Sequence, residues 1–135
     1  MDRATAIDQL RAAFKDRPGI VAAYLFGSVA RDEARPSSDV DIGVILAQGR
    51  PRNLEELVPL DDLREELALL VGREVDLVPM NEAHPELLHR ILRDGVLLHE
   101  TDHAARVNFE VQARNEYWDL LPILEHYRRT VLENA

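Results

Sequence analysis

The sequence predicts a mixed α/β (α+β) fold, in which helices flank a small mixed β-sheet and a long helical segment follows. Short apolar runs rich in β-branched residues alternate with segments of helical periodicity, and Pro, Gly or capping residues mark the changes between them. A chain of 135 residues suits one domain with one core. We therefore expect a single domain, with a core formed by residues 1–100 and a C-terminal helical segment formed by residues 101–135.

The first part of the chain alternates between helical and strand-like patterns. Residues 3–16 have apolar side chains at helical spacing, and the Pro-Gly pair that follows ends the helix. Residues 20–26 form a continuous apolar run, as in a strand that is buried on both faces. The polar stretch 29–35 has room for two helical turns, and residues 40–46 predict a second strand.

The segment from Leu54 to Val71 has a helical pattern. Asn53 precedes it and is a suitable N-cap, because its side-chain oxygen can accept a hydrogen bond from a free N–H of the first turn. Gly72 suits the C-terminal cap, which needs a left-handed backbone conformation. Because Pro59 lacks an N–H, we expect a kink or a restart of the helix there.

Three shorter elements follow. Residues 74–79 predict a strand, and residues 85–93 predict a short helix with proline at its first turn, where a missing N–H costs little. Residues 96–99 suit a short final strand. The predicted order is helix and strand in alternation, which gives a small sheet covered by helices.

The C-terminal segment is helical in pattern from residue 101 to about 133, with Thr101 as the expected N-cap. Pro122 is expected to kink or divide it. Tyr117 and Trp118 lie on its apolar stripes, which predicts core packing and leaves part of the stripe for a partner. We expect this segment to be the surface on which a partner docks.

Composition excludes several functions. The chain has 25 acidic and 16 basic residues, a formal net charge of −9, which argues against direct nucleic-acid binding and against a polybasic membrane anchor. It has no cysteine, so disulfides, zinc–thiolate sites and thiol nucleophiles are excluded. The five histidines have no ligand spacing. Without a signal peptide or a membrane-spanning run, we expect a cytoplasmic protein with no membrane contact.

An Asp-x-Asp pair at the start of the second predicted strand carries the chemistry. Asp39 and Asp41 are two residues apart, so both carboxylates point to one face of the strand. Two such carboxylates repel each other unless a cation lies between them. Oxygen ligands of this kind suit Mg²⁺, which fills its remaining positions with water and substrate phosphates.

A Gly-Ser pair precedes the acidic pair. Gly27 and Ser28 lie where the first buried strand ends, and residues 29–38 separate them from Asp39. Glycine permits a close backbone approach, and a helix N-terminus offers free N–H groups to an anion. A phosphate cradle opposite a metal clamp is the apparatus for nucleotidyl transfer from a nucleoside triphosphate. Arg31 follows within about one turn and is either a phosphate ligand or a surface arginine.

Asp76 is the candidate for a third carboxylate on a neighbouring strand. It lies between apolar residues in the run EVDLV, where an acidic side chain is either solvated at an edge or functional. Our prediction is that Asp76 is a metal ligand, and two alternatives remain for it: a metal ligand only, or a metal ligand that is also the general base for the acceptor. The Asp-x-Asp pair alone is weak support for a site. Its position after Gly27-Ser28, between two apolar strands, makes it specific.

These residues resemble the hallmark of the nucleotidyltransferase superfamily that includes DNA polymerase β, namely Gly-Ser, then Asp-x-Asp at this spacing, then a later aspartate. The nearest resemblance is to minimal nucleotidyltransferases, the antitoxins of HEPN-domain toxin pairs. It covers essentially the whole chain. Its specific motifs are FGSVAR and SDVDIGVIL, and its softer ones are GREVDLV, HPELLHRILRDGVLLHE and RNEYWDLLPILEHYRR.

This resemblance implies the nucleotidyltransferase fold and a defined activity. Such antitoxins use ATP with Mg²⁺ to transfer AMP to a tyrosine of the partner HEPN toxin, an RNase, and so silence it. Two alternatives remain: a nucleotidyltransferase acting on a small molecule such as an aminoglycoside, and a binding module that only masks a toxin. Because the sheet and its helices use most of the chain, the acceptor is expected on a second protein.

Overall fold

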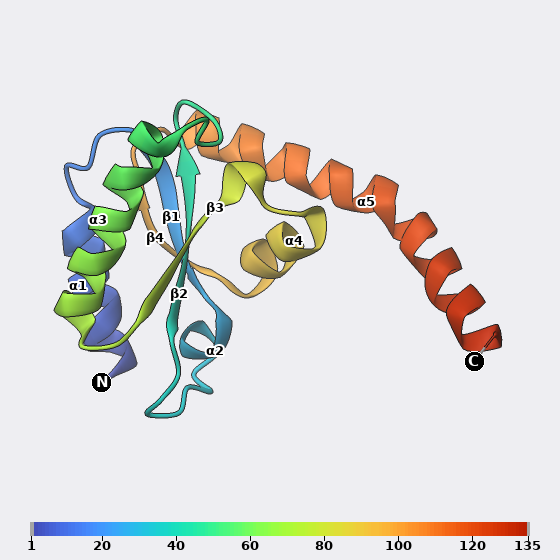
Figure 1. Cartoon of the computed structure of the whole chain (residues 1–135), viewed down its shortest axis with the longest axis horizontal. Coiled ribbons are helices and arrows are strands. Elements are labelled where there is room, and N and C mark those ends of the chain that lie inside the picture. The colour runs from blue at the N-terminus through green and yellow to red at the C-terminus, as the bar shows by residue number, and fades with distance from the viewer. Residues whose placement is uncertain (1, 135) are drawn as a thin grey trace.

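The computed structural model describes residues 2–134 and contains one four-stranded sheet between two helical layers (Figure 1). The strands are β1 (Ile20–Phe26), β2 (Val40–Leu46), β3 (Val75–Pro79) and β4 (Val96–Glu100). The helices are α1 (Arg3–Phe14), α2 (Gly27–Ala30), α3 (Leu54–Val71), α4 (Pro85–Asp94) and α5 (His103–Glu133), with a 3-10 turn, η1 (Met80–Glu82). The expected mixed α/β fold with a long C-terminal helix is confirmed.

The sheet has the strand order β3-β2-β1-β4. Strand β1 pairs antiparallel with both β2 and β4, whereas β2 and β3 are parallel. The parallel pair requires a crossover, which α3 supplies. Helices cover both faces of β1, and its first six residues are buried, which explains the continuous apolar run in the sequence.

Each face of the sheet has its own apolar cluster. On one face, α1 and α3 bring Phe14 and Leu67 against Leu25 of β1. On the other face, α4 and η1 bring Ile91 and Met80 into a cluster with β1 and α5. The two helical layers therefore hold the sheet from both sides and fix the ends of its strands.

Helix α3 is a single helix through Pro59, so the restart considered from the sequence does not occur. Proline removes one backbone hydrogen bond, and the buried face that includes Leu63 and Leu67 compensates for that loss. Both predicted caps are confirmed: the Asn53 side chain accepts from the backbone N–H of Glu56, and Gly72 has φ +71° in the left-handed region.

Two local predictions are wrong. The stretch 29–35 does not form two helical turns, because α2 ends at Ala30 and Asp32 has a left-handed backbone, φ +58°. Thr101 does not cap α5, because its hydroxyl donates to the carbonyl of Ile20 (2.8 Å) and ties the chain to the sheet. Asp102 caps the helix instead, accepting from Ala105 N (3.0 Å).

Helix α5 begins on the sheet and extends away from it (Figure 1). It is one helix through Pro122, and Figure 1 shows it changing direction along its second half. Ala113 is its one buried residue, and Trp118 is 65% exposed, so the core packing expected for Trp118 is wrong. Tyr117 stacks on His89 of α4, with ring centroids 3.9 Å apart. No helix within residues 2–134 has the length and apolarity needed to cross a membrane.

Candidate active site

The predicted Gly-Ser and Asp-x-Asp residues meet at one end of the sheet, where β1 ends and β2 begins. Phe26 of β1 pairs with Asp41 of β2, so Gly27, the next residue, lies beside Asp41. Ser28 follows in the first turn of α2. The antiparallel pairing thus brings together residues that are well separated in sequence.

Gly27 is required at this position for two physical reasons. Its φ of +74° lies in the left-handed region, which side chains disfavour. A Cβ atom on Gly27 would lie 2.2 Å from Oδ2 of Asp41, inside any permitted contact. The missing side chain therefore lets the Asp41 carboxylate approach the backbone at the start of α2.

The three predicted carboxylates lie close together at one end of the sheet. Asp41 pairs in register with Asp76 across the parallel strands β2 and β3, so both side chains lie on the same face. Asp39 precedes Asp41 by two residues. Burial raises the pKa of the Asp41 carboxyl above its ordinary value, and the charges of Asp76 and Asp39 raise this pKa further. Arg31 acts in the opposite direction and lowers the pKa of Asp41.

These carboxylates suit Mg²⁺ by their donor chemistry. Carboxylate oxygens are its preferred protein ligands, and a cation would relieve the repulsion that raises the pKa of Asp41. Asp39 and Asp76 are exposed and Asp41 is half-buried, so all three can reach solvent. Within residues 2–134, no three acidic or histidine side chains already converge as a closed ligand set.

A cleft of about 330 Å³ opens beside Asp41. It is lined by Phe26, Gly27, Ser28, Arg31, Asp41, Leu87, Arg90 and Asp94. Four of the six predicted site residues therefore share one cleft, while Asp39 and Asp76 are absent from its lining. Arg31 hydrogen-bonds to Glu33 (Nε to Oε2, 3.1 Å) and is also near enough to Asp94 to lower the pKa of that carboxyl. The Arg93 hydrogen bond is the larger cause of that lowering.

Sequence reasoning missed the wall that α4 contributes. Leu87, Arg90 and Asp94 follow helical spacing and project from one face of α4 into the cleft. Their spacing in the sequence could have shown that they share a face. It could not have shown that this face lies beside Gly27, because that depends on how α4 packs on the sheet.

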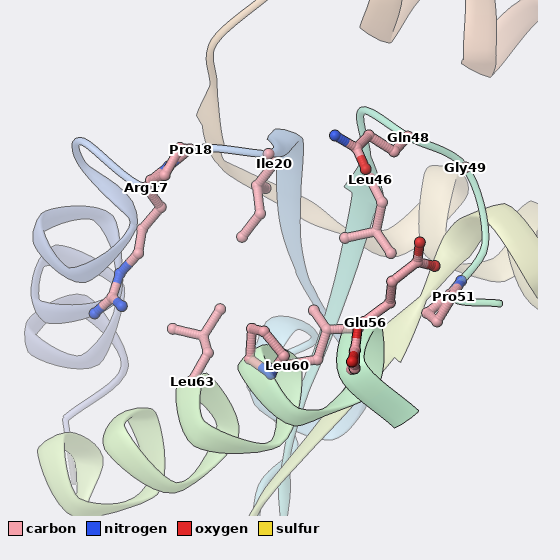
Figure 2. A pocket seen from close by; sticks show the side chains of 13 residues that line it. Arg17, Pro18, Ile20, Leu46, Gln48, Gly49, Pro51, Glu56, Leu60 and Leu63 are labelled. Carbon is pink, nitrogen blue, oxygen red and sulfur yellow. The ribbon is translucent and has the colours of Figure 1, made fainter. Parts of the chain in front are cut away.

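A second and larger cavity, of about 470 Å³, lies at the opposite end of the sheet (Figure 2). It lies where β1 begins, at Ile20, and where β2 ends, at Leu46. Leu60 and Leu63 of α3 form much of its floor, and Pro51 lies in the adjoining loop. None of the predicted site residues lines it.

Comparison with known proteins is consistent with this geometry. The model of the family described as polymerase beta, nucleotidyltransferase, matches residues 8–104. MJ0435 of Methanocaldococcus jannaschii, which is named for protein adenylyltransferase activity, is 40% identical over 78 residues. That alignment covers 58% of this chain and 78% of the relative.

Two solved structures share the fold along nearly the whole chain. A toxin–antitoxin structure with AMP-PNP has a TM-score of 0.69 and 24% identity, covering 99% of this chain and 98% of that one. A tri-AMPylated HEPN toxin of Shewanella oneidensis in complex with its MNT antitoxin matches with a TM-score of 0.67 and 22% identity. This second match covers 98% of both chains.

Proposed function

Since this chain belongs to the polymerase β nucleotidyltransferase family, we propose that it is an antitoxin that transfers AMP from ATP to a tyrosine of a cognate HEPN-type RNase toxin. The observation that carries the proposal is the register of Asp41 with Asp76 directly beside Gly27. The named activity of MJ0435 and the toxin–antitoxin structures support a protein acceptor. We place the reaction in the cytoplasm, where ATP is available.

Asp39, Asp41 and Asp76 are the residues that would hold Mg²⁺. When bound, the ion supplies positive charge that activates the acceptor oxygen and stabilises the phosphates. Gly27 and Ser28 would hold the triphosphate through free N–H groups and the Ser28 hydroxyl. Their closeness to Asp41 brings the α-phosphate to the carboxylates.

The transfer forms one bond and breaks one. The tyrosine Oη attacks the α-phosphorus, the bond from that phosphorus to the oxygen bridging to the β-phosphorus breaks, and pyrophosphate leaves. The phenolic proton passes to a carboxylate. Asp76 suits this role because it is exposed on β3, the edge strand, where an incoming acceptor can reach it.

Helix α5 is the proposed docking surface for the toxin. It leaves several large apolar side chains exposed, namely Val107, Val111, Trp118, Ile123, Tyr127, Val131 and Leu132. Exposed apolar side chains grouped along one helix are typical of protein interfaces. We expect Trp118→Ala to weaken toxin binding at least about 10-fold. It should change the free energy of unfolding by less than about 0.5 kcal/mol.

The activity test uses α-labelled ATP, Mg²⁺ and each HEPN-type protein encoded in the same genome. The wild type should label a tyrosine of the cognate protein, and Asp39→Asn with Asp41→Asn should abolish labelling while leaving binding intact. The matched control is Asp61→Asn with Asp62→Asn, the same change in charge on α3, away from the cleft. Label on a small molecule without a protein partner would instead support the small-molecule transferase.

Neutralisation in cells separates catalysis from masking. If the double variant at Asp39 and Asp41 still protects cells from the toxin, the chain acts by covering its partner. If the double variant folds and binds but fails to protect, transfer of AMP is the mode of action.

A further inference from the structure

One face of α4 forms a wall of the cleft and carries a cation. Leu87, Arg90 and Asp94 lie three and then four residues apart, and all three line the cleft. Arg90 is the middle residue of this face. The cleft therefore receives side chains from α4 on one side and from the Gly27-Ser28 turn and Asp41 on the other.

Packing fixes where α4 lies. Ile91 is fully buried, and its side chain reaches the sheet beside Gly43, where a Cβ would lie 3.5 Å from it. Gly95 ends the helix where a Cβ would lie 2.2 Å from the carbonyl oxygen of Ile91. On the side towards α5, His89 stacks on Tyr117. Because α4 is held on several sides, the position of Arg90 along the cleft wall is determined by the fold.

The charges in the cleft leave Arg90 unpaired. Arg31 bonds to Glu33, and Asp94 bonds to Arg93 (2.8 Å), so each of these two groups already has a partner. Within residues 2–134, Arg90 has neither an ion pair nor a side-chain hydrogen bond, although the chain carries a net charge of −9. An arginine that lines a cleft and finds no carboxylate is available for an anion from solution.

We propose that Arg90 binds the outer phosphates of the nucleoside triphosphate and holds the pyrophosphate as it leaves. The inference rests on the proposed function and adds a substrate-binding residue to it. Gly27 and Ser28 would hold the α-phosphate end of the triphosphate beside Asp41, so the outer phosphates would extend to the opposite wall, where Arg90 lies. A guanidinium there can donate two parallel hydrogen bonds to phosphate oxygens.

Nucleotide binding tests this without a toxin. AMP-PNP and AMP are titrated by calorimetry, with Mg²⁺ present, into the wild type, Arg90→Gln and Arg90→Lys. Arg90→Gln should weaken AMP-PNP binding by about 10- to 100-fold, because a hydrogen-bonded charge is lost, and AMP binding by less than about 2-fold. The AMP-PNP affinity of Arg90→Lys should lie between those of the wild type and Arg90→Gln, because lysine keeps the charge without the paired donors.

Arg50→Gln is the matched control. It removes another exposed arginine, which lies in the loop after β2 at the opposite end of the sheet, and it should bind both nucleotides like the wild type. Unchanged AMP-PNP binding by Arg90→Gln overturns the inference. Equal weakening for AMP and AMP-PNP also overturns it, because that pattern indicates a distorted cleft.

The outcome for Arg90 is separate from that for protein AMPylation. If the wild type binds AMP-PNP but labels no HEPN protein, the proposed function fails while the selective loss in Arg90→Gln still holds. If the wild type does not bind AMP-PNP, both the proposed function and the inferred role of Arg90 are wrong.

Discussion

The two ends of the sheet differ in how their charges are arranged. At the end with the larger cavity, the lining is mostly apolar, and the Glu56 carboxylate there pairs with Arg52 (2.8 Å). At the other end, Asp41 is half-buried beside two further carboxylates. The smaller cavity is thus the one that lies beside several carboxylates of like charge. This contrast teaches that cavity size is a poor guide to the site here, whereas like charges held close together mark the candidate site.

Gly27→Ala is expected to lower activity strongly although every carboxylate of the site is still present. A Cβ there would collide with Oδ2 of Asp41, so AMP transfer should fall by about 100- to 1,000-fold, the cost of a misplaced charged group. Gly49→Ala is the matched control at the other end, because Gly49 also has a left-handed backbone (φ +82°) but no atom lies within 4 Å of its Cβ position. Both variants should lose about 1–2 kcal/mol of stability, measured by urea unfolding. An equal loss of activity in Gly49→Ala would contradict the contrast between the ends.

Leu63→Ala tests the far end as scaffold. Leu63 is 5% exposed and lines the larger cavity, so its truncation should lower the free energy of unfolding by about 2–4 kcal/mol. The KM for ATP should stay within about 2-fold of the wild type. Leu69→Ala, at a position that is 86% exposed, should change stability by less than about 0.5 kcal/mol. If Leu63→Ala folds normally but raises the KM for ATP at least 10-fold, the two ends are coupled.

Asp41→Asn should stabilise the fold while abolishing transfer. The raised pKa of the Asp41 carboxyl, caused first by burial, means that its ionised form opposes folding at neutral pH. Removing that charge should increase the free energy of unfolding by no more than about 1 kcal/mol, because partial exposure of the side chain weakens the effect. Asp8→Asn, on the exposed side of α1, should leave stability unchanged. A stability loss in Asp41→Asn would show that the carboxylate has a structural partner.

Glu100→Gln should have the smallest effect, limited to part of the pH range. The hydrogen bond from Arg106 lowers the pKa of the Glu100 carboxyl, with a second contribution from His103. The folded state therefore holds this proton less tightly than the unfolded chain. The resulting stability is present above the ordinary carboxyl pKa and is lost as the pH falls through the lowered one.

The measurement for Glu100→Gln is the urea midpoint of both proteins across pH. The wild type should be the more stable at about pH 7, and the difference should disappear by about pH 2–3. If the urea midpoints of the two proteins still differ at about pH 2–3, the effect comes from packing of the Glu100 side chain and not from its charge. Nucleotide binding should not change, because Glu100 pairs with Ala22 near the start of β1, away from the cleft.

Sequence periodicity was sufficient for most of the fold, because burial here follows local pattern. The apolar run of β1 and the caps of α3 at Asn53 and Gly72 were each predictable from a few neighbouring residues. The errors arose where a distant contact decided the outcome. Thr101 was expected to cap α5, but its hydroxyl bonds to Ile20, a residue far away in the sequence.

The same distinction holds for the candidate site. Gly27 directly follows β1, and Asp41 lies on β2, the antiparallel partner of β1, so their meeting could be predicted from motif spacing and strand pattern. Arg90 could not be placed, because its position depends on the packing of α4 against Gly43 and on the close turn at Gly95. The exposure of Trp118 could not be predicted from the sequence either, because the apolar stripe of α5 has the pattern of a core helix.

The parallel pairing of β2 with β3 has a consequence for when the site can exist. A chain emerging from the ribosome completes β1 and β2 first and can bring Gly27 beside Asp41 by local pairing alone. Asp76 joins them only after α3 has crossed over and β3 has docked, which is a slower, longer-range step. The order of synthesis therefore delays the complete carboxylate set until α3 and β3 have joined the sheet.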